Sequence, residues 1–184
     1  MNINEKINLN DLLIDQRIVF LIGEITQEVA NDFMLKLLYL ASLDAEKDIK
    51  IYLNTPGGDT NAMSAIIDVM KFVKNDIAIV NLSCAYSAGS LILANGTKGK
   101  RYMLPSAKVM IHQVSLITGK NKWNRDELTD VTLQILDTQN YYINSMIDNT
   151  KMTREQLLEF MNKDTYLNAR ECIELGIIDK ILED

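Results

Sequence analysis

Short apolar runs alternate along this chain with longer segments in which apolar residues recur every three or four positions. The longer segments, residues 27–43, 60–74 and 125–149, have the spacing of amphipathic helices. The short runs are typical of buried strands: residues 17–22, 49–53, 77–84, 109–112 and 177–182. Strands that alternate with helices predict an α/β fold whose sheet is largely parallel.

Composition limits the kinds of protein this can be. With 184 residues and 47% hydrophobic residues, the chain predicts a single domain with a real core. The 19 Lys and Arg against 25 Asp and Glu give a net charge of −6, which argues against binding of nucleic acid. No apolar run reaches the roughly 18–20 residues that span a bilayer, and the start MNINEKINLN is polar. We therefore expect no membrane association and no secretory signal.

The chain has two cysteines and one histidine, which limits the chemistry available to it. Cys84 and Cys172 form no CxxC motif and lie in apolar contexts, so we expect reduced, buried thiols in a cytoplasmic protein. His112 is the one histidine, and no spacing of metal ligands accompanies it. We expect no metal site, and any mechanism that uses an imidazole must use His112.

Three features fall at the carboxyl ends of predicted strands, the edge where parallel sheets form their sites. They are Pro56-Gly57-Gly58, Ser87 and His112. A serine at a strand-to-helix turn can act as a nucleophile, and glycine turns can present free N–H groups to an oxyanion. Each feature also has a plain structural explanation: a tight turn, a helix cap or a core histidine.

Other signals are weaker. Asp164 reads as a loop carboxylate that is either solvated or able to reach inward, just before a capped helix. Thr153-x-x-Gln156 and Asn168-x-x-Glu171 resemble capping boxes, and Gly176 is placed to end the last helix. The basic cluster of Lys98, Lys100 and Arg101 favours a solvated turn over a phosphate site.

Six stretches of the chain, taken together, resemble the Clp protease proteolytic subunit, a family of serine peptidases. They occur in the same order over about residues 9–182. The stretches are residues 17–21, 46–49 running into 52–58, Ala85-Tyr-Ser-Ala-Gly89, 96–101 with 104–105, Met110-Ile-His-Gln113, and 171–179.

The resemblance implies a crotonase-like fold of repeated ββα units in one domain, residues 1–184. A short N-terminal segment would cover residues 1–16, and a protruding strand–helix handle about residues 113–149. It also implies a serine endopeptidase acting through an acyl-enzyme without a cofactor. Ser87 would be the nucleophile, His112 the general base and then acid, and Asp164 the group that orients the imidazole.

The binding surfaces implied by the resemblance are more extended. Backbone N–H groups of Gly58 and Ala88 would form the oxyanion hole. A substrate-binding strand, at which peptides bind by strand addition, would comprise Gln113, Val114, Ser115 and Leu116. A docking surface for an unfoldase would comprise Lys50, Tyr52, Phe72, Tyr102 and Leu182.

The family also implies an assembly. Two heptameric rings would stack as a tetradecamer around the active sites, fed with unfolded polypeptides by a hexameric AAA+ unfoldase that consumes ATP. Such a protease would serve protein quality control in the cytoplasm, with a paralogue of this chain as a further partner.

The sequence departs from the family at several points. The N-terminal segment is short, Gln113-Val-Ser-Leu-Ile117 replaces a glycine-rich stretch, and Asn162-Lys163 replaces an acidic–arginine pair. Lys50 replaces an aromatic residue of the docking surface, which predicts weaker docking or a paralogue that supplies the usual surface.

Two rival functions stay open at this point. One is a poorly active structural ring subunit that works with a paralogue. The other is a non-protease crotonase-fold enzyme acting on acyl-CoA, which would leave the Ser87, His112 and Asp164 set unexplained.

Overall fold

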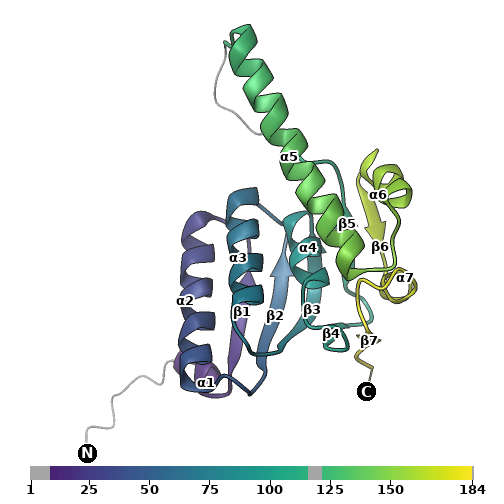
Figure 1. The fold of residues 1–184 in the computed structure, drawn as a ribbon. Coiled ribbons are helices and arrows are strands. Elements are labelled where there is room, and N and C mark those ends of the chain that lie inside the picture. Colours follow the sequence, from purple (N-terminus) through teal and green to yellow (C-terminus); the bar gives the residue numbers. More distant parts are fainter. Residues whose placement is uncertain (1–8, 116–121, 184) are drawn as a thin grey trace, which may run out of the picture.

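One sheet of mostly parallel strands forms the centre of the protein (Figure 1). The computed structural model describes residues 9–115 and 122–183 of the chain. In these residues the main path of the sheet has the order β1-β2-β3-β4-β7. The strands of this path are β1 (Ile18–Ile22), β2 (Ile49–Thr55), β3 (Ile77–Tyr86), β4 (Arg101–Met103) and β7 (Lys180–Ile181).

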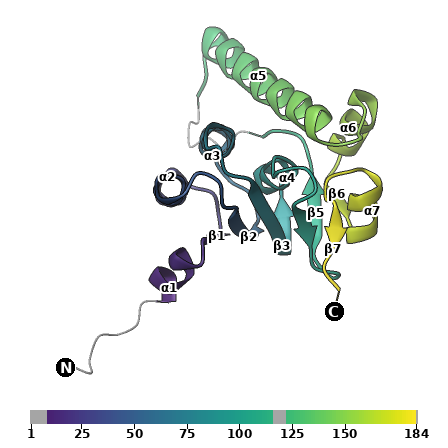
Figure 2. The same cartoon turned by 60° about the horizontal axis from the view of Figure 1, so that its bottom comes forward.

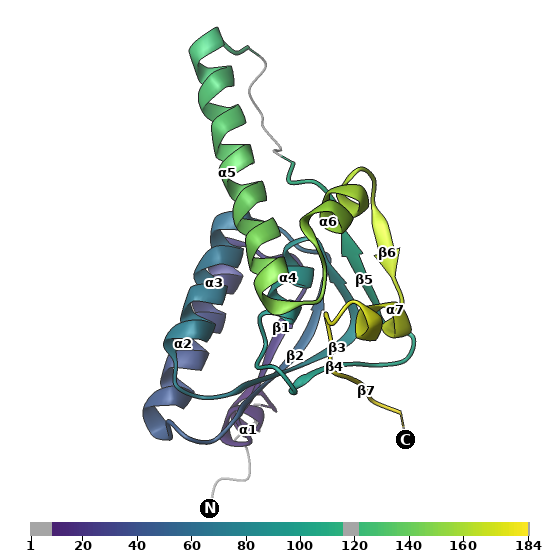
Figure 3. The ribbon, with the colours of Figure 1, turned by 45° about the vertical axis from the view of Figure 1, so that its right-hand side comes forward.

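The long strand β3 changes neighbour half-way, and this branches the sheet. Residues 79–81 pair with β4, whereas residues 84–86 pair with β5 (Lys108–Ile111), in both cases parallel. On its other side β5 pairs antiparallel with β6 (Thr165–Leu167), as Figure 3 shows. The predicted α/β class with a largely parallel sheet is confirmed, and the β5–β6 pair is the antiparallel exception.

Helices α2 (Gln27–Leu43), α3 (Thr60–Phe72) and α4 (Ala88–Ala94) lie together on one face of the sheet (Figure 2). The predicted apolar stripes of α2 and α3 share one core cluster with the inward side chains of β2, and this core lies between the two layers. Its fully buried members include Phe33, Leu37, Ile66, Ile67, Ile49, Ile51 and Leu53. Burial of this stripe is what holds α2 and α3 as helices in the folded chain.

Helix α5 (Arg125–Asn149) matches its predicted bounds, and it projects away from the body of the protein (Figures 1 and 3). Its buried residues, Tyr142, Ile143, Ser145 and Met146, all lie in the second half of the helix. The first half exposes Leu128, Leu133 and Leu136. The predicted strand of the handle lies partly outside the described residues, and residues 113–115 form no strand.

The predicted capping boxes are confirmed. Thr153 and Gln156 bond each other's backbone at the start of α6 (Arg154–Met161), and Asn168 and Glu171 do so at α7 (Ala169–Glu174). Gly176 follows α7 with φ +70°, a conformation that L side chains rarely adopt, so it ends the helix as predicted.

The sequence pattern did not predict α1 (Leu9–Asp15), β4 or β6 as elements. The two strands have three residues each, too few for a two-residue period to show, and both are held by pairing with strands distant in sequence. The last strand covers Lys180–Ile181 alone, shorter than the predicted residues 177–182.

The prediction of a solvated basic turn is wrong for Arg101, which is 4% exposed. Its guanidinium binds both carboxylate oxygens of Asp179, at 2.9 and 2.6 Å, and donates to the carbonyl of Asn149 at 2.7 Å. Lys100 instead stays at the surface, where its Nζ lies 2.7 and 2.8 Å from carboxylate oxygens of Asp48 and Asp76.

Candidate active site

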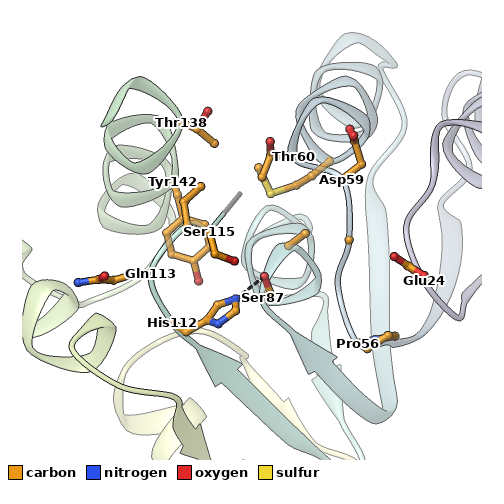
Figure 4. Close-up of a pocket in the computed structure, with 14 residues that line it drawn as sticks. Glu24, Pro56, Asp59, Thr60, Ser87, His112, Gln113, Ser115, Thr138 and Tyr142 are labelled. Carbon is orange, nitrogen blue, oxygen red and sulfur yellow. Dashed lines mark hydrogen bonds between the residues drawn. The ribbon is translucent and has the colours of Figure 1, made fainter. Parts of the chain in front are cut away.

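A pocket of about 430 Å³ opens at the carboxyl ends of β2, β3 and β5. Ser87, His112 and Gly58 line it together, although they come from three separate stretches of sequence (Figure 4). The predicted convergence of these strand ends is therefore what the fold produces.

Ser87 occupies a strained turn between β3 and α4. Its backbone has φ +52° and ψ −119°, which a residue with a Cβ rarely adopts. The Ser87 N–H donates to the carbonyl of Met110 at 2.9 Å, which ties the turn to β5. The side chain makes no capping hydrogen bond, so the explanation of Ser87 as a helix cap is wrong. The hydroxyl faces the pocket instead.

The imidazole of His112 lies beside this hydroxyl. Its Nε2 is 2.8 Å from Ser87 Oγ, within hydrogen-bond distance (Figure 4). On the other side of the ring, Nδ1 is 3.4 Å from Asp164 Oδ1, longer than an ordinary hydrogen bond. The side chain of Asp164 is 60% exposed. The Ser–His link is therefore formed, and the His–Asp link is loose.

The antiparallel β5–β6 pair brings Asp164 to His112. Ile111 of β5 pairs with Thr165 of β6. Because the two strands are antiparallel, His112, which follows Ile111, lies opposite Asp164, which precedes Thr165. Asp164 was nearly uninformative in the sequence because β6 is too short to be predicted.

The two glycines after Pro56 allow the turn to approach Ser87. Gly57 has φ +97°, and a Cβ there would lie 2.7 Å from Ser87 Cβ. Gly58 has φ +150°, and a Cβ there would lie 2.3 Å from the carbonyl oxygen of Ile25. Both positions require glycine on steric grounds.

Two backbone donors next to Ser87 are unused. Within residues 9–115 and 122–183, neither the Gly58 N–H nor the Ala88 N–H has an acceptor. Ala88 begins α4, where N–H groups have no partner in their own helix. Both residues line the pocket, so both amides are available to a ligand there.

Replacing Gly58 tests the turn. We expect Gly58→Ala to lower the turnover of a substrate by ~10²–10³-fold, because the Cβ clash with Ile25 must move the Gly58 N–H. Steady-state kinetics on the purified variant measures this. Gly99→Ala is the matched control, since Gly99 also has positive φ but a Cβ there meets no atom within 4 Å. Equal effects of the two substitutions would contradict the prediction that the Gly58 N–H stabilises an oxyanion.

Comparison with known proteins agrees with this geometry. A protein-family model described as Clp protease matches residues 2–184. The ATP-dependent Clp protease proteolytic subunit of Lactococcus lactis subsp. lactis (strain IL1403) is 38% identical over 172 residues, covering 94% of this chain and 86% of that protein. The subunit of the same name from Streptococcus uberis is also 38% identical, over 94% of this chain and 87% of its own length. The chain belongs to the Clp protease family.

The pocket of this Clp protease chain brings together some, not all, of the residues predicted from the sequence to bind substrate. Of the positions predicted to bind substrate, Gln113, Val114 and Ser115 line the pocket, while Leu116 lies outside the described residues. Sequence reasoning missed other lining residues, among them Glu24, Met63, Thr138 and Tyr142. Thr138 and Tyr142 are four residues apart on α5, a spacing that places them on one face.

Three of the five predicted docking residues, Lys50, Tyr52 and Tyr102, lie on one face of the sheet. Tyr52 of β2 and Tyr102 of β4 both pair with Val80 of the strand between them, and Lys50 is two residues before Tyr52. Phe20, which was not among the predicted docking residues, extends this row on β1 and contacts Tyr52 with ring centroids 5.4 Å apart.

The remaining two docking candidates, Leu182 and Phe72, lie outside this row of residues. Leu182 directly follows β7, and its N–H donates to the carbonyl of Met103. Phe72 ends α3 and is 79% exposed, on a helix that covers the opposite face of the sheet.

Both cysteines are free, as expected. Cys172 is buried, and burial raises the pKa of its thiol to about 12. Cys84 is partly exposed, which corrects its expected burial, and its Sγ donates to Asn54 Oδ1 at 3.1 Å. Among the described residues, no three His, Cys, Asp or Glu side chains are grouped so as to hold a metal ion, and no helix has the length and apolarity to cross a membrane.

Proposed function

We propose that this chain is the proteolytic subunit of an ATP-dependent Clp protease and that Ser87, His112 and Asp164 are its catalytic residues. The observation that carries the assignment is the 2.8 Å contact between His112 Nε2 and Ser87 Oγ, beside two unused amides. A base within hydrogen-bond reach of a hydroxyl is the arrangement that activates a serine nucleophile.

The mechanism follows from these positions. His112 takes the proton of Ser87 as Oγ attacks the carbonyl carbon of a peptide bond, and the N–H groups of Gly58 and Ala88 stabilise the resulting oxyanion. His112 then gives the proton to the leaving amine, which leaves an acyl-enzyme. Water, activated by the same imidazole, hydrolyses the ester and restores Ser87.

A fluorophosphonate probe tests the assignment directly, because it reacts with activated serines. We expect one modification per chain, at Ser87, located by peptide mass spectrometry. An acyl-CoA enzyme of the crotonase type would not be labelled there. Absence of label at Ser87 in the assembled particle would refute the proposal.

Exposed apolar side chains on two helices support assembly into rings. Helix α2 exposes Leu35, Tyr39 and Leu43, and the projecting half of α5 exposes Leu128, Leu133 and Leu136. Apolar surface of this kind marks protein contacts, and contacts of two kinds are what stacked rings need. We propose heptameric rings stacked as a tetradecamer in the cytoplasm, fed with unfolded polypeptide by a hexameric Clp ATPase.

Lys50 is the position at which we expect docking of that ATPase to be tuned. Its side chain is exposed one row from the aromatic pair of Phe20 and Tyr52, on the same face of the sheet. An ammonium group beside an apolar loop of a partner costs desolvation energy. Lys50→Tyr should therefore raise ATP-dependent degradation by the cognate unfoldase several-fold.

The control for docking is ATP-independent hydrolysis of a short peptide, which Lys50→Tyr should leave unchanged. Lys108→Tyr is the matched surface substitution, an exposed lysine on β5, a strand that carries none of the proposed docking residues. If Lys50→Tyr gave no gain in pull-down or degradation, the assignment of this surface would be wrong.

One observation favours the second candidate, a poorly active ring subunit that depends on a paralogue. The 3.4 Å gap from His112 Nδ1 to the largely exposed Asp164 leaves the imidazole weakly oriented. The purified chain decides between the two: hydrolysis of short peptides on its own supports an independent peptidase, and hydrolysis that requires an added paralogue supports the second candidate.

A further inference from the structure

A chain of two hydroxyl groups links helix α5 to the turn that carries Ser87. Ser90 Oγ lies 2.5 Å from the backbone carbonyl oxygen of Ser87 and 2.6 Å from the hydroxyl oxygen of Tyr142. Ser90 is fully buried in α4, and Tyr142 is 4% exposed on the inner half of α5. The proposed mechanism uses neither hydroxyl.

The direction of these hydrogen bonds follows from proton counting. A carbonyl oxygen can only accept, so the single proton of the Ser90 hydroxyl goes to Ser87 O. Ser90 Oγ must then accept from Tyr142, whose hydroxyl is the donor. Burial raises the pKa of Tyr142, so the phenol keeps the proton that this role requires.

The carbonyl that receives these bonds belongs to the same peptide unit as the Ala88 N–H. The Ser90 N–H also donates to Ser87 O, at 3.0 Å, so two donors hold this oxygen. Because a trans peptide is planar, fixing the direction of its C=O fixes the direction of its N–H. The two hydrogen bonds to Ser87 O therefore also fix the direction of the Ala88 N–H, and Ala88 lines the pocket.

Such a grip matters here because Ser87 is strained. A residue with φ +52° persists when surrounding contacts hold it, and rotation of the following peptide is one way to relieve the strain. The Ser90 hydroxyl opposes that rotation, and Tyr142 fixes the Ser90 hydroxyl from α5. The position of α5 is thereby coupled to the orientation of an oxyanion donor.

We propose that Ser90 and Tyr142 are positioning residues that hold the Ser87–Ala88 peptide with its N–H directed at the oxyanion. The inference rests on the proposed function, since it assigns these residues to the same reaction. If it is correct, removing either hydroxyl group weakens stabilisation of the transition state by the Ala88 N–H, while the affinity for the peptide substrate stays the same.

Ser90→Ala and Tyr142→Phe test this in the full-length assembled chain. We expect kcat per fluorophosphonate-titrated site to fall roughly tenfold for Ser90→Ala and roughly threefold for Tyr142→Phe, below the ~10²–10³-fold of losing the donor itself. KM should stay within about twofold, because both hydroxyl groups are already hydrogen-bonded within the protein, Ser90 to Ser87 O and Tyr142 to Ser90. The Ki of a peptide aldehyde, whose adduct oxygen occupies the oxyanion site, should rise by the same factor as kcat falls.

The double variant separates a relay from two independent effects. Because Tyr142 acts through Ser90, Ser90→Ala with Tyr142→Phe should have the kcat of Ser90→Ala alone. Tyr141→Phe is the matched control: it removes a phenol from the same helix at a residue that does not line the pocket, and kcat should not change.

The outcomes distinguish this inference from the proposed function. An active, Ser87-labelled wild type whose kcat survives both substitutions within twofold overturns the inference and leaves the function intact. A lowered melting temperature with unchanged kcat and Ki also overturns it, because packing alone explains that result. If Ser90→Ala does not fold, the nearly isosteric Tyr142→Phe tests the inference. An unchanged kcat and Ki in that variant overturns it. A wild type that is neither active nor labelled refutes the proposed function, and this inference with it.

Discussion

Ser87→Ala should abolish peptide hydrolysis, with kcat falling by ~10⁴–10⁶-fold. Without Oγ no acyl-enzyme forms, and the oxyanion donors alone stabilise slow attack by water. The hydroxyl contacts His112 and makes no capping bond, so its loss should leave folding and assembly intact. Peptide hydrolysis, with mass and melting temperature measured on the same sample, checks both expectations.

The matched control is Ser83→Ala, a serine on the same strand that is exposed and lies outside the pocket. It should keep the activity of the wild type. Peptide hydrolysis that persisted in Ser87→Ala and was insensitive to fluorophosphonate would remove Ser87 from the mechanism.

Asp179→Asn should destabilise the fold by about 3–5 kcal/mol, because it leaves the buried guanidinium of Arg101 without a counter-charge. Asp179 also accepts from the backbone N–H groups of Arg101 and Gly99, at 3.0 and 2.8 Å, so this carboxylate joins β4 to the turn before β7. Urea unfolding measures the loss. Asp76→Asn, at the exposed partner of Lys100, should change stability little.

The same ion pair predicts a pH dependence. Burial by itself would raise the pKa of Asp179, but the hydrogen bonds from Arg101 and Gly99 outweigh burial and lower the pKa below its ordinary value. A carboxyl whose pKa is lower in the folded state adds stability at pH values above its unfolded pKa. That stability disappears as the pH falls through the folded pKa, so wild type should weaken in acid.

Asp179→Asn removes this titration, so its stability should vary less with pH below about pH 4 than that of wild type. Urea midpoints measured for both proteins across that range provide the test. Parallel curves for wild type and variant would show that the Asp179 carboxyl does not carry the effect.

The candidate active site is built from sequence signals that are weak when each is taken alone. No single motif around Ser87 or His112 identifies a nucleophile and its base. The 2.8 Å contact arises because β3 and β5 pair in parallel and end at the same edge of the sheet. Asp164 depends on one further strand pairing, β5 with β6, and it lies 3.4 Å from His112, farther than Ser87 does.

What the sequence determined by itself was local. Apolar periods gave α2, α3 and α5, the strand cores and the α/β class, and the capping residues gave the starts of α6 and α7. These features follow from contacts within a few residues, so a short window carries the signal. The order of strand ends was sufficient to bring Gly58, Ser87 and His112 to one edge.

Tertiary structure decided the rest, because it concerns partners distant in sequence. The three-residue strand β6 exists through its pairing with β5, and it sets Asp164 opposite His112. Arg101 could be read as a solvated cation until folding placed Asp179 against it. The link from Tyr142 through Ser90 spans α5 and α4, and the fold alone brings those hydroxyl groups within hydrogen-bond distance.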